Sequence, residues 1–336
     1  MKKVRLGFIG CGVHATRDLF PNIPLIPEIE LVATCDLKIE LAKQNARLFG
    51  AKKYYSDFEE MLANEILDAV AIVGPPKMHT EIGLACLGYG LHIFIEKPIA
   101  ITLEDANKLA KAADKAGKFA QIGHFLRHSD GHQLAKKIIK SKKFGDPILI
   151  NCKYFTCGPW EPRQEWGLSD LNWTYMIVQG IHLIDLTRYF MGEIKSLNAK
   201  RYLSKTGHLS FSVVAQFESK ALGLMSFTSL SPSWKSSVEI VGDEGSYIKV
   251  ENATKLIYDQ ATIEGNKSNF DESFISRTWD GSTSYKSKPS FGYFGELQHF
   301  AKSILLNKQP SPNLWDGYKA MTIASTIIES AKTQCR

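Results

Sequence analysis

A glycine-rich turn near the start of the chain has the spacing of a phosphate-binding loop. Directly after the apolar run VRLGFI, the pattern G-x-G-x-x-G/A is matched by Gly10, Cys11, Gly12, Val13, His14 and Ala15. Such glycines permit a tight turn and let the backbone approach a pyrophosphate, which then lies on a helix amino terminus. We therefore predict that the first five of these residues bind a dinucleotide.

Asp36 closes the next apolar run, ELVATCD, and bears on the identity of that dinucleotide. A carboxylate at this position accepts hydrogen bonds from a ribose 2′-hydroxyl and repels the 2′-phosphate of NADP. The residue therefore favours NAD. Lys38 lies close enough in sequence to soften the repulsion, so NADP is kept as the alternative.

His182 lies in MIVQGIHLID, a stretch typical of the start of a helix, with Asp185 on the same face. Histidine titrates near neutral pH and can exchange a proton with a substrate, but on an apolar helix it can also be a core residue. Asp185 can orient the imidazole or form a structural pair with Arg188. An acid–base histidine would be expected to have a polar partner one turn earlier, where Val178 stands.

The segment CGPWEPRQEWGLSDLNWTY concentrates aromatic side chains around one arginine. These residues are Trp160, Trp166, Trp173, Tyr175 and Arg163. Aromatic faces stack on sugar rings, and arginine binds phosphate or carboxylate in a bidentate fork. The segment predicts a sugar site, anionic or nucleotide-linked; a rigid lid or a subunit contact is the alternative. His124 and Arg127, in IGHFLRH, are further candidate substrate-binding residues.

The elements that must position these residues fall into two groups. Up to residue 122, apolar runs such as VRLGFIG, ELVATCD, DAVAIVG, LHIFIE and KFAQIG alternate with amphipathic helical patterns closed by glycine. This is typical of parallel strands covered on both faces, and it predicts an α/β Rossmann doubly wound sheet over 1–122.

From about Asp146 the runs alternate apolar and polar residues, as in HLSFSVVAQFES and KSSVEIVGDEGSYIKV, with a hairpin turn at Gly242 to Gly245. This predicts a C-terminal α+β domain over 123–313, with a large, mostly antiparallel, open-faced sheet for substrate binding and oligomerisation. A helix at about 314–333 is expected to pack back on the first domain. Asn266 to Ser290 is predicted to be a polar, mobile region.

Composition excludes several other classes of protein. A chain of 336 residues exceeds one hydrophobic core, and its net charge of +6 is spread along the chain, so no nucleic-acid partner is predicted. No run approaches the roughly 20 apolar residues of a membrane span. The six cysteines lack metal-site spacing, so we predict no metal and a cytoplasmic protein with reduced thiols.

With IEKP, Ile95 to Pro98, the chain resembles the Gfo/Idh/MocA family of NAD(P)-dependent sugar and cyclitol oxidoreductases. The segments VGPPKMHTEIGLACLGYGLHIFIEKPIA, GIHLIDLTRYFMG and GELQHFAKSILLNKQPSPNLWDGYKA are similar to other parts of that family, so the resemblance runs end to end. Because an exposed sheet face often pairs with another copy, we expect a homodimer or homotetramer through the C-terminal sheet.

The resemblance also implies roles for individual residues. Lys97 would lie beside the nicotinamide and bind the reacting oxygen, and His182 would be the acid–base residue. The cofactor cleft would be lined by Glu96, Gly74, Pro75 and Pro76, with His79 nearby. The chemistry agrees, because oxidising a secondary alcohol removes the hydroxyl proton as hydride leaves carbon. A positive charge at the oxygen and a group titrating near neutrality both assist this.

Many members of the family carry an acidic residue where this chain has Val178. Catalysis can proceed with Lys97 and His182 alone, another group can substitute (His124, Asp170 or Tyr175), or the site can have become a binding site. Three functions therefore stay open: an NAD-dependent dehydrogenase, a non-catalytic dinucleotide-binding regulatory protein, and an NAD-dependent glycoside hydrolase. We favour the first, because Lys97, Glu96 and His182 all persist.

Overall fold

The computed structural model describes residues 2–261, 274–281 and 291–333, and it contains two compact units. Unit 1 comprises Met1–Phe125, Arg163–Ser169 and Gly292–Thr322; unit 2 comprises Leu126–Pro162, Asp170–Phe291 and Ile323–Arg336. The division is discontinuous along the chain, whereas the sequence predicts one boundary near residue 122. Residues 292–313, predicted to belong to the second domain, lie in unit 1.

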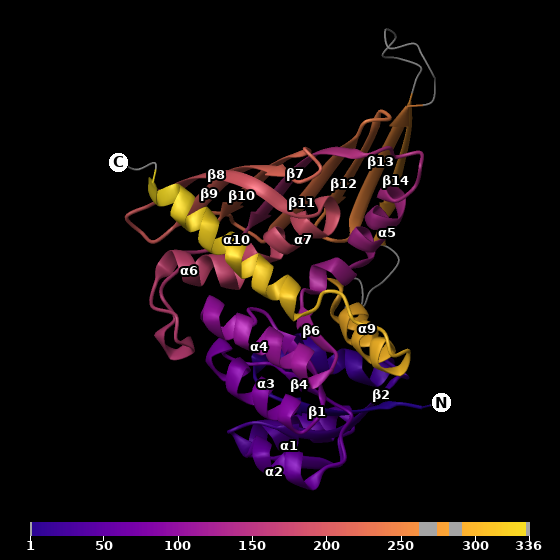
Figure 1. Ribbon diagram of the computed structural model, residues 1–336, viewed down its shortest axis with the longest axis vertical. Helices are drawn as coiled ribbons and strands as arrows, with labels where there is room; N and C mark the ends of the chain where they lie inside the picture. Colours follow the sequence, from indigo (N-terminus) through magenta and orange to yellow (C-terminus); the bar gives the residue numbers. More distant parts are fainter. Residues whose placement is uncertain (1, 262–273, 282–290, 334–336) are drawn as a thin grey trace. The chain divides into compact units, whose positions relative to one another are not determined.

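The sheet of unit 1 has six strands, all parallel, in the order β3-β2-β1-β4-β5-β6 (Figure 1). They are β1 Val4–Ile9, β2 Ile29–Cys35, β3 Lys53–Tyr55, β4 Ala69–Ile72, β5 His92–Glu96 and β6 Ala120–Gly123. This order confirms the predicted Rossmann fold, with the chain reversing direction across the sheet between β1 and β4. Only β3 was not predicted, because this three-residue edge strand has no buried run.

Capping residues mark the ends of several helices in unit 1. They are α1 Ile39–Phe49, α2 Phe58–Asn64, α3 His79–Gly88, α4 Leu103–Ala116 and α9 Tyr293–Leu305. The next helix, α10 Leu314–Thr333, belongs to unit 1 up to Thr322 and to unit 2 from Ile323. Thr102 caps α4 by accepting a hydrogen bond from the amide of Asp105, and Gly117 ends it in the left-handed conformation. The predicted closing glycines are confirmed for α1, α3 and α4; after α3 the glycine is Gly90, with φ +74°, one residue beyond Tyr89.

The segment after the glycine-rich turn is not a regular α-helix. It forms a π-turn over Ala15–Leu19 and a 3₁₀-helix over Phe20–Leu25. Pro21 and Pro24 lie in the second piece, and proline lacks the amide that an α-helical ladder needs. The chain therefore forms a helical turn directly after the glycines but does not continue as an α-helix.

Helix α9 completes the core of unit 1 although it lies far along the chain. Leu297, Phe300 and Ala301 are fully buried in the same apolar cluster as residues of β1, and Phe300 lies against Phe94 with ring centroids 6.0 Å apart. The amphipathic pattern of α9 thus serves the nucleotide-binding fold.

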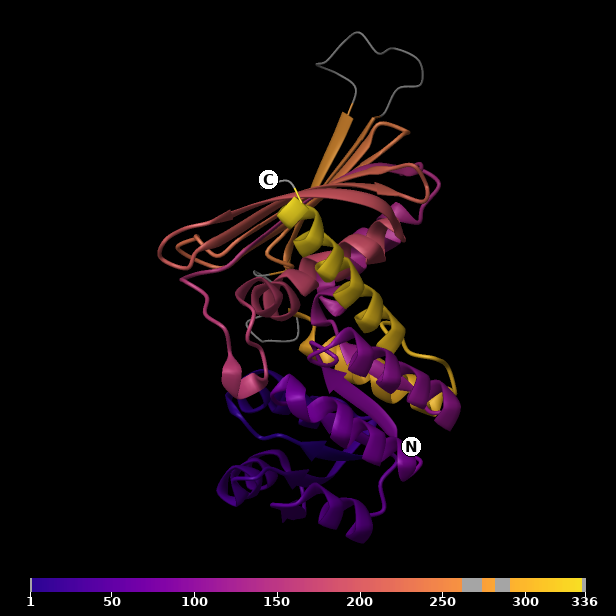
Figure 2. The same ribbon diagram turned by 60° about the vertical axis from the view of Figure 1, so that its left-hand side comes forward.

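Unit 2 is built on an eight-stranded sheet in the order β14-β13-β12-β11-β7-β10-β9-β8 (Figures 1 and 2). The strands are β7 Pro147–Phe155, β8 Ile194–Leu203, β9 Leu209–Phe217, β10 Leu222–Thr228, β11 Lys235–Gly242, β12 Ser246–Glu251, β13 Lys255–Ala261 and β14 Phe274–Asp280. Only β7 and β10 pair in parallel, so the predicted mostly antiparallel sheet is confirmed.

Helices cover one face of this sheet. Helix α7, Ile181–Met191, packs on β7, and α5, Asp130–Ile139, packs on β12 and β13 of the same face; the short α6 spans Leu171–Tyr175 (Figures 1 and 2). Alternation along β9 and β10 leaves Val214, Leu222 and Leu224 exposed. The sheet therefore has the exposed face that its residue pattern predicts.

The predicted hairpin at Gly242 to Gly245 is confirmed as the turn between β11 and β12. The prediction for Asn266 to Ser290 is wrong in part, because Phe274–Asp280 forms β14 paired with β13. Residues 266–273 and 282–290 of that stretch lie outside the described residues. In the part of the chain that is described, no helix is both long and apolar enough to cross a membrane.

Candidate functional site

The glycine-rich turn has the geometry that dinucleotide binding requires. Gly10 has φ +95°, and a Cβ there would lie 1.8 Å from the carbonyl oxygen of Val73, so only glycine fits. At Gly12 an added Cβ would meet no heavy atom within 4 Å. The amide of Cys11 donates to Oδ2 of Asp36 at 2.8 Å, which ties the predicted ribose-binding carboxylate to the turn. The open backbone beside Gly12 fits a pyrophosphate.

The two glycines should respond differently to alanine. We expect Gly10→Ala to lower the free energy of unfolding by roughly 1–3 kcal/mol from left-handed backbone strain alone. Gly12→Ala should unfold like the wild type, yet bind NADH about tenfold more weakly because its methyl group occupies the pyrophosphate space. Urea unfolding and NADH fluorescence titration measure these effects. Unchanged NADH affinity in Gly12→Ala would contradict the assignment of the turn.

Three residues that the sequence predicts for the cofactor site lie together at the carboxyl end of β5. Oε1 of Glu96 lies 3.5 Å from Nε2 of His14, whose Nδ1 lies 3.0 Å from Asp18, and Oε2 of Glu96 accepts from the amide of Lys97 at 2.9 Å. Glu96 is buried and Lys97 is partly buried. His14, Glu96 and Lys97 therefore form one charged cluster beside the glycine-rich turn.

Burial and charge act in opposite directions on this cluster. Burial lowers the pKa of Lys97, against the attraction of Glu96 and Glu296. Burial disfavours the carboxylate of Glu96, but its ion pair with His14 and the charge of Lys97 outweigh this effect and lower its pKa. For His14, burial opposes protonation, yet Glu96 and Asp18 raise its pKa. The lowered pKa of Glu96 and the raised pKa of His14 favour the charged form of both side chains.

Glu296, on α9, was not predicted. Burial raises the pKa of its carboxyl well above the ordinary value, and the charge of Glu96 adds to this effect. A signal existed in the sequence, since Glu296 stands among Tyr293, Leu297 and Phe300 at helical spacing, an acid on an apolar face.

The turn after β4 holds the other predicted cofactor residues. A Cβ on Gly74 would lie 2.4 Å from Sδ of Met78, and Pro75 and Pro76 lead into a 3₁₀ turn before α3. His79 is fully buried, with Nδ1 2.9 Å from the carbonyl oxygen of Pro98, and burial lowers its pKa to about 4. A neutral His79 thus links α3 to the residue after Lys97, which supports a packing role.

His182 lies in unit 2, in a helical run interrupted by a π-turn over Met176–Gly180, where the amide of Ile181 donates to the carbonyl of Met176. Such turns are frequent at functional sites. The imidazole stacks on Tyr154 of β7, with ring centroids 5.5 Å apart, and Oη of Tyr154 donates to Oε1 of Gln179 at 3.3 Å. Tyr154 and Gln179 are polar groups beside His182 that the sequence did not predict.

The predicted substitutes for an acid at Val178 have other positions. Asp170 caps α6, where its carboxylate accepts from the amide of Trp173 at 2.7 Å. Tyr175 is fully buried against Trp160 and Phe211. His124 is buried just after β6 in unit 1. Asp170 and Tyr175 therefore have structural surroundings within unit 2.

Arg127 and Asp185 form a buried bidentate ion pair in unit 2. Nη2 of Arg127 lies 2.6 Å from Oδ1 of Asp185, and Nε lies 2.7 Å from Oδ2. Arg188, the other partner that the sequence suggests for Asp185, pairs with Glu193 at 2.7 Å. The geometry favours a structural role for both members of the Arg127–Asp185 pair.

The aromatic segment divides between the two units. Arg163 stacks on Trp166 at 4.6 Å in the stretch that belongs to unit 1, and Gly167 of that stretch lies against Ile101. Trp173 and Tyr175 lie on α6 of unit 2. The segment is therefore not a single aromatic cluster.

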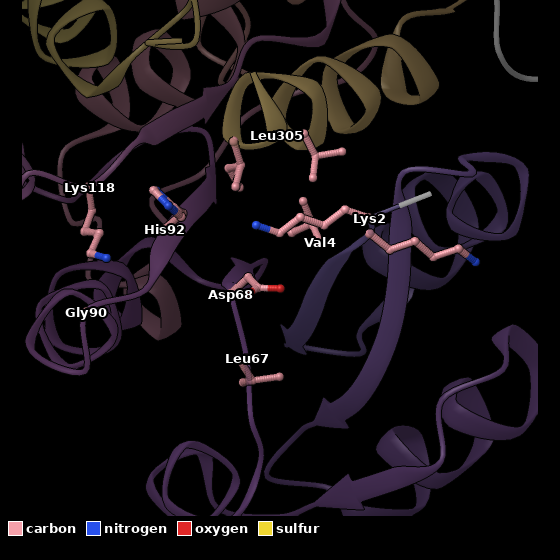
Figure 3. Close-up of a pocket in the computed structure, with 10 residues that line it drawn as sticks. Lys2, Val4, Leu67, Asp68, Gly90, His92, Lys118 and Leu305 are labelled. Carbon is pink, nitrogen blue, oxygen red and sulfur yellow. The ribbon is translucent and has the colours of Figure 1, made fainter. Parts of the chain in front are cut away.

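A pocket of about 250 Å³ lies at the opposite edge of the Rossmann sheet, where Lys2, Asp68, His92 and Lys118 line it (Figure 3). Its lining includes no predicted site residue, and ligands of doubly wound sheets bind at the carboxyl ends of the strands. This pocket is not the candidate site. Within residues 2–261, 274–281 and 291–333 there is no cluster of three metal-ligating side chains.

Two family models match almost the whole chain. Residues 4–124 match an oxidoreductase family with an NAD-binding Rossmann fold, and residues 136–335 match the C-terminal alpha/beta domain of the same family. The chain belongs to the Gfo/Idh/MocA oxidoreductase family. It is an NAD-dependent oxidoreductase, as the sequence predicts.

Individual relatives are distant but span the full length. An inositol 2-dehydrogenase of Klebsiella pneumoniae is 23% identical, over 98% of this chain and 94% of that protein. An inositol 2-dehydrogenase/D-chiro-inositol 3-dehydrogenase of Halalkalibacterium halodurans is 26% identical, over 98% and 92%.

Solved structures share the fold. A dehydrogenase from Chromobacterium violaceum has a TM-score of 0.91 at 21% identity, covering 99% of this chain and 96% of that one. Levoglucosan dehydrogenase in complex with NADH and L-sorbose has a TM-score of 0.82 at 22% identity, covering 99% and 98%.

Proposed function

We propose that this enzyme transfers hydride between a nicotinamide and a secondary alcohol or ketone of a sugar, cyclitol or sugar derivative. The observation that carries the proposal is the cluster of Lys97 with Glu96 at the carboxyl end of β5, in a family whose members include inositol and levoglucosan dehydrogenases. A phosphorylated or nucleotide-linked substrate also fits, since a UDP-N-acetylglucosamine 3-dehydrogenase shares the fold.

In this proposal Lys97 and His182 have different roles in the reaction. Lys97 holds the reacting oxygen with its ammonium group, which stabilises negative charge as the hydroxyl proton leaves. His182 exchanges that proton, and the aromatic ring of Tyr154 holds the imidazole plane. The nicotinamide, when bound, accepts or supplies the hydride. The turn at Gly10–His14 and the carboxylate of Asp36 hold the dinucleotide.

The test is a change in nicotinamide absorbance with purified protein, NAD or NADP, and a panel of cyclitols, free sugars, sugar phosphates and nucleotide sugars. Turnover would name the substrate class and show that an acid at Val178 is dispensable. Release of sugar from glycosides without net cofactor reduction would instead identify a glycoside hydrolase. Tight NADH binding with no turnover across the panel would favour a binding protein.

The preference for NAD can be tested at Asp36. Asp36→Asn keeps an oxygen that can accept from the amide of Cys11 but removes the charge. We expect the ratio of NADPH to NADH affinity to rise about tenfold. Asp36→Ala should weaken NADH binding further, because it also frees the Cys11 amide. Fluorescence titration measures both dissociation constants, and an unchanged ratio in Asp36→Asn would show that the charge does not select the cofactor.

We also propose a cytoplasmic homodimer or homotetramer. The exposed Val214, Leu222 and Leu224 on the open face of the sheet support association of two copies. The free, buried Cys11, Cys35, Cys86 and Cys152 are consistent with a reducing compartment, whereas Cys335 lies outside the described residues. Light scattering on the purified protein measures the number of copies.

A further inference from the structure

The carboxyl group of Glu296 is buried and forms no hydrogen bond with the described residues. The side chain is 0% exposed, and in the described part of the chain neither Oε1 nor Oε2 has a hydrogen-bond partner. Its backbone is fixed, because Nε2 of Gln121 donates to the carbonyl oxygen of Glu296 at 2.8 Å. A buried, unbonded polar group costs free energy, and such groups concentrate at functional sites.

The groups that bear on Glu296 come from the end of β5, from β6 and from α9. The charges of Glu96 and Lys97 act on it from the end of β5, and Glu96 itself forms an ion pair with His14 at 3.5 Å. Strand β6 contributes Gln121, which carries no charge, and Tyr293 precedes Glu296 by one turn on α9, with its ring against His14. Burial and the charge of Glu96 both favour the protonated carboxyl of Glu296, and together they outweigh the opposing charge of Lys97.

A positive charge brought to Lys97 would change this balance. The oxidised nicotinamide ring is a cation, whereas the reduced ring is neutral. If the ring lies beside Lys97, as the proposed function requires, oxidised cofactor stabilises the Glu296 carboxylate and reduced cofactor does not.

We propose that Glu296 is a proton store linked to the redox state of the cofactor, protonated when the nicotinamide is reduced and ionised when it is oxidised. This inference rests on the proposed function. Alcohol oxidation sends a hydride to the nicotinamide and releases the hydroxyl proton; the Glu296 carboxylate takes up one proton as the positive ring becomes neutral. That proton leaves the protein when NADH is exchanged for NAD. Glu296 acts through Lys97 and the cofactor, so it is a positioning residue.

Cofactor binding as a function of pH tests the proposal without any sugar. In the wild type, NAD affinity should rise with pH by up to about tenfold per unit, because NAD binding expels a proton, whereas NADH affinity should stay flat. In Glu296→Gln, a neutral residue of the same shape, both affinities should be flat. Calorimetric titrations in two buffers of different ionisation enthalpy count the same proton directly.

Lys97→Arg is the matched control, because arginine keeps the positive charge and does not titrate. The pH dependence of NAD binding should persist in this variant. Loss of the dependence in Lys97→Arg, with retention in Glu296→Gln, would assign the proton to Lys97 and overturn the proposal. Flat NAD affinity in the wild type would also overturn it while leaving the dehydrogenase function intact. Failure to bind either nucleotide would overturn both.

If Glu296→Gln does not fold, infrared difference spectra of the wild type test the same proposal. Replacing NADH by NAD should remove the carbonyl band of one protonated carboxylic acid. A spectrum without this change would contradict the proposal.

Discussion

Lys97→Met should lower kcat by about 10²–10³-fold, the effect of removing one preorganised charge from a developing oxyanion. Methionine has a similar length and shape but carries no charge, so NADH should still bind with an affinity close to that of the wild type. Turnover and NADH titration on the same preparation separate the two effects. Lys111→Met, on the exposed face of α4, is the matched control and should leave both quantities unchanged.

The wild type should also lose activity at alkaline pH for the same reason. Burial lowers the pKa of Lys97 below the ordinary lysine value. The ammonium form is present below that pKa, so kcat should fall as pH rises through it. A kcat that is flat through the alkaline range in the wild type, or equal in wild type and Lys97→Met, would exclude Lys97 as the oxygen-binding group.

Arg127→Met should lower the free energy of unfolding by about 3–5 kcal/mol, because it leaves the Asp185 carboxylate buried without its partner. Both side chains of this pair are almost fully buried, with exposures of 6% and 2%. The double variant Arg127→Met/Asp185→Leu should recover most of the loss, since it removes both charges together. Urea unfolding measures all three proteins.

Arg188→Met is the matched control for this prediction. Its partner Glu193 is 40% exposed and can be solvated once the arginine is gone, so the loss should be well under that of Arg127→Met. If instead Arg127→Met unfolds like the wild type but has a raised KM for the substrate, Arg127 is a substrate-binding residue and the structural reading of the pair is wrong.

Local patterns in the sequence predicted the parts of the fold that local physics determines. The runs that became β1, β2, β4, β5 and β6 are mainly apolar because both faces of a parallel sheet are covered. The glycine-rich turn was recognisable because Gly10 has a positive φ that other residues rarely adopt.

Features that depend on distant partners could not be read in this way. Nearness in sequence suggests Arg188 as a partner for Asp185, whereas Arg127, which pairs with it, lies 58 positions away. The stacking of His182 on Tyr154 joins a helix to a strand that precedes it, and nothing in either segment alone indicates it. Glu296 was missed because its significance comes from Glu96 and Lys97, which lie on another element.

The place of α9 in the core of unit 1 has a consequence for how the protein is made. A ribosome completes β6 at Gly123, but Leu297, Phe300 and Glu296 are synthesised only after the whole of β7 to β14. Until α9 has been synthesised, the nascent nucleotide-binding unit therefore leaves part of its apolar core exposed, while the second unit emerges and folds. A truncated chain ending near residue 125 would lack this helix, and premature termination anywhere before residue 305 should yield an aggregation-prone fragment.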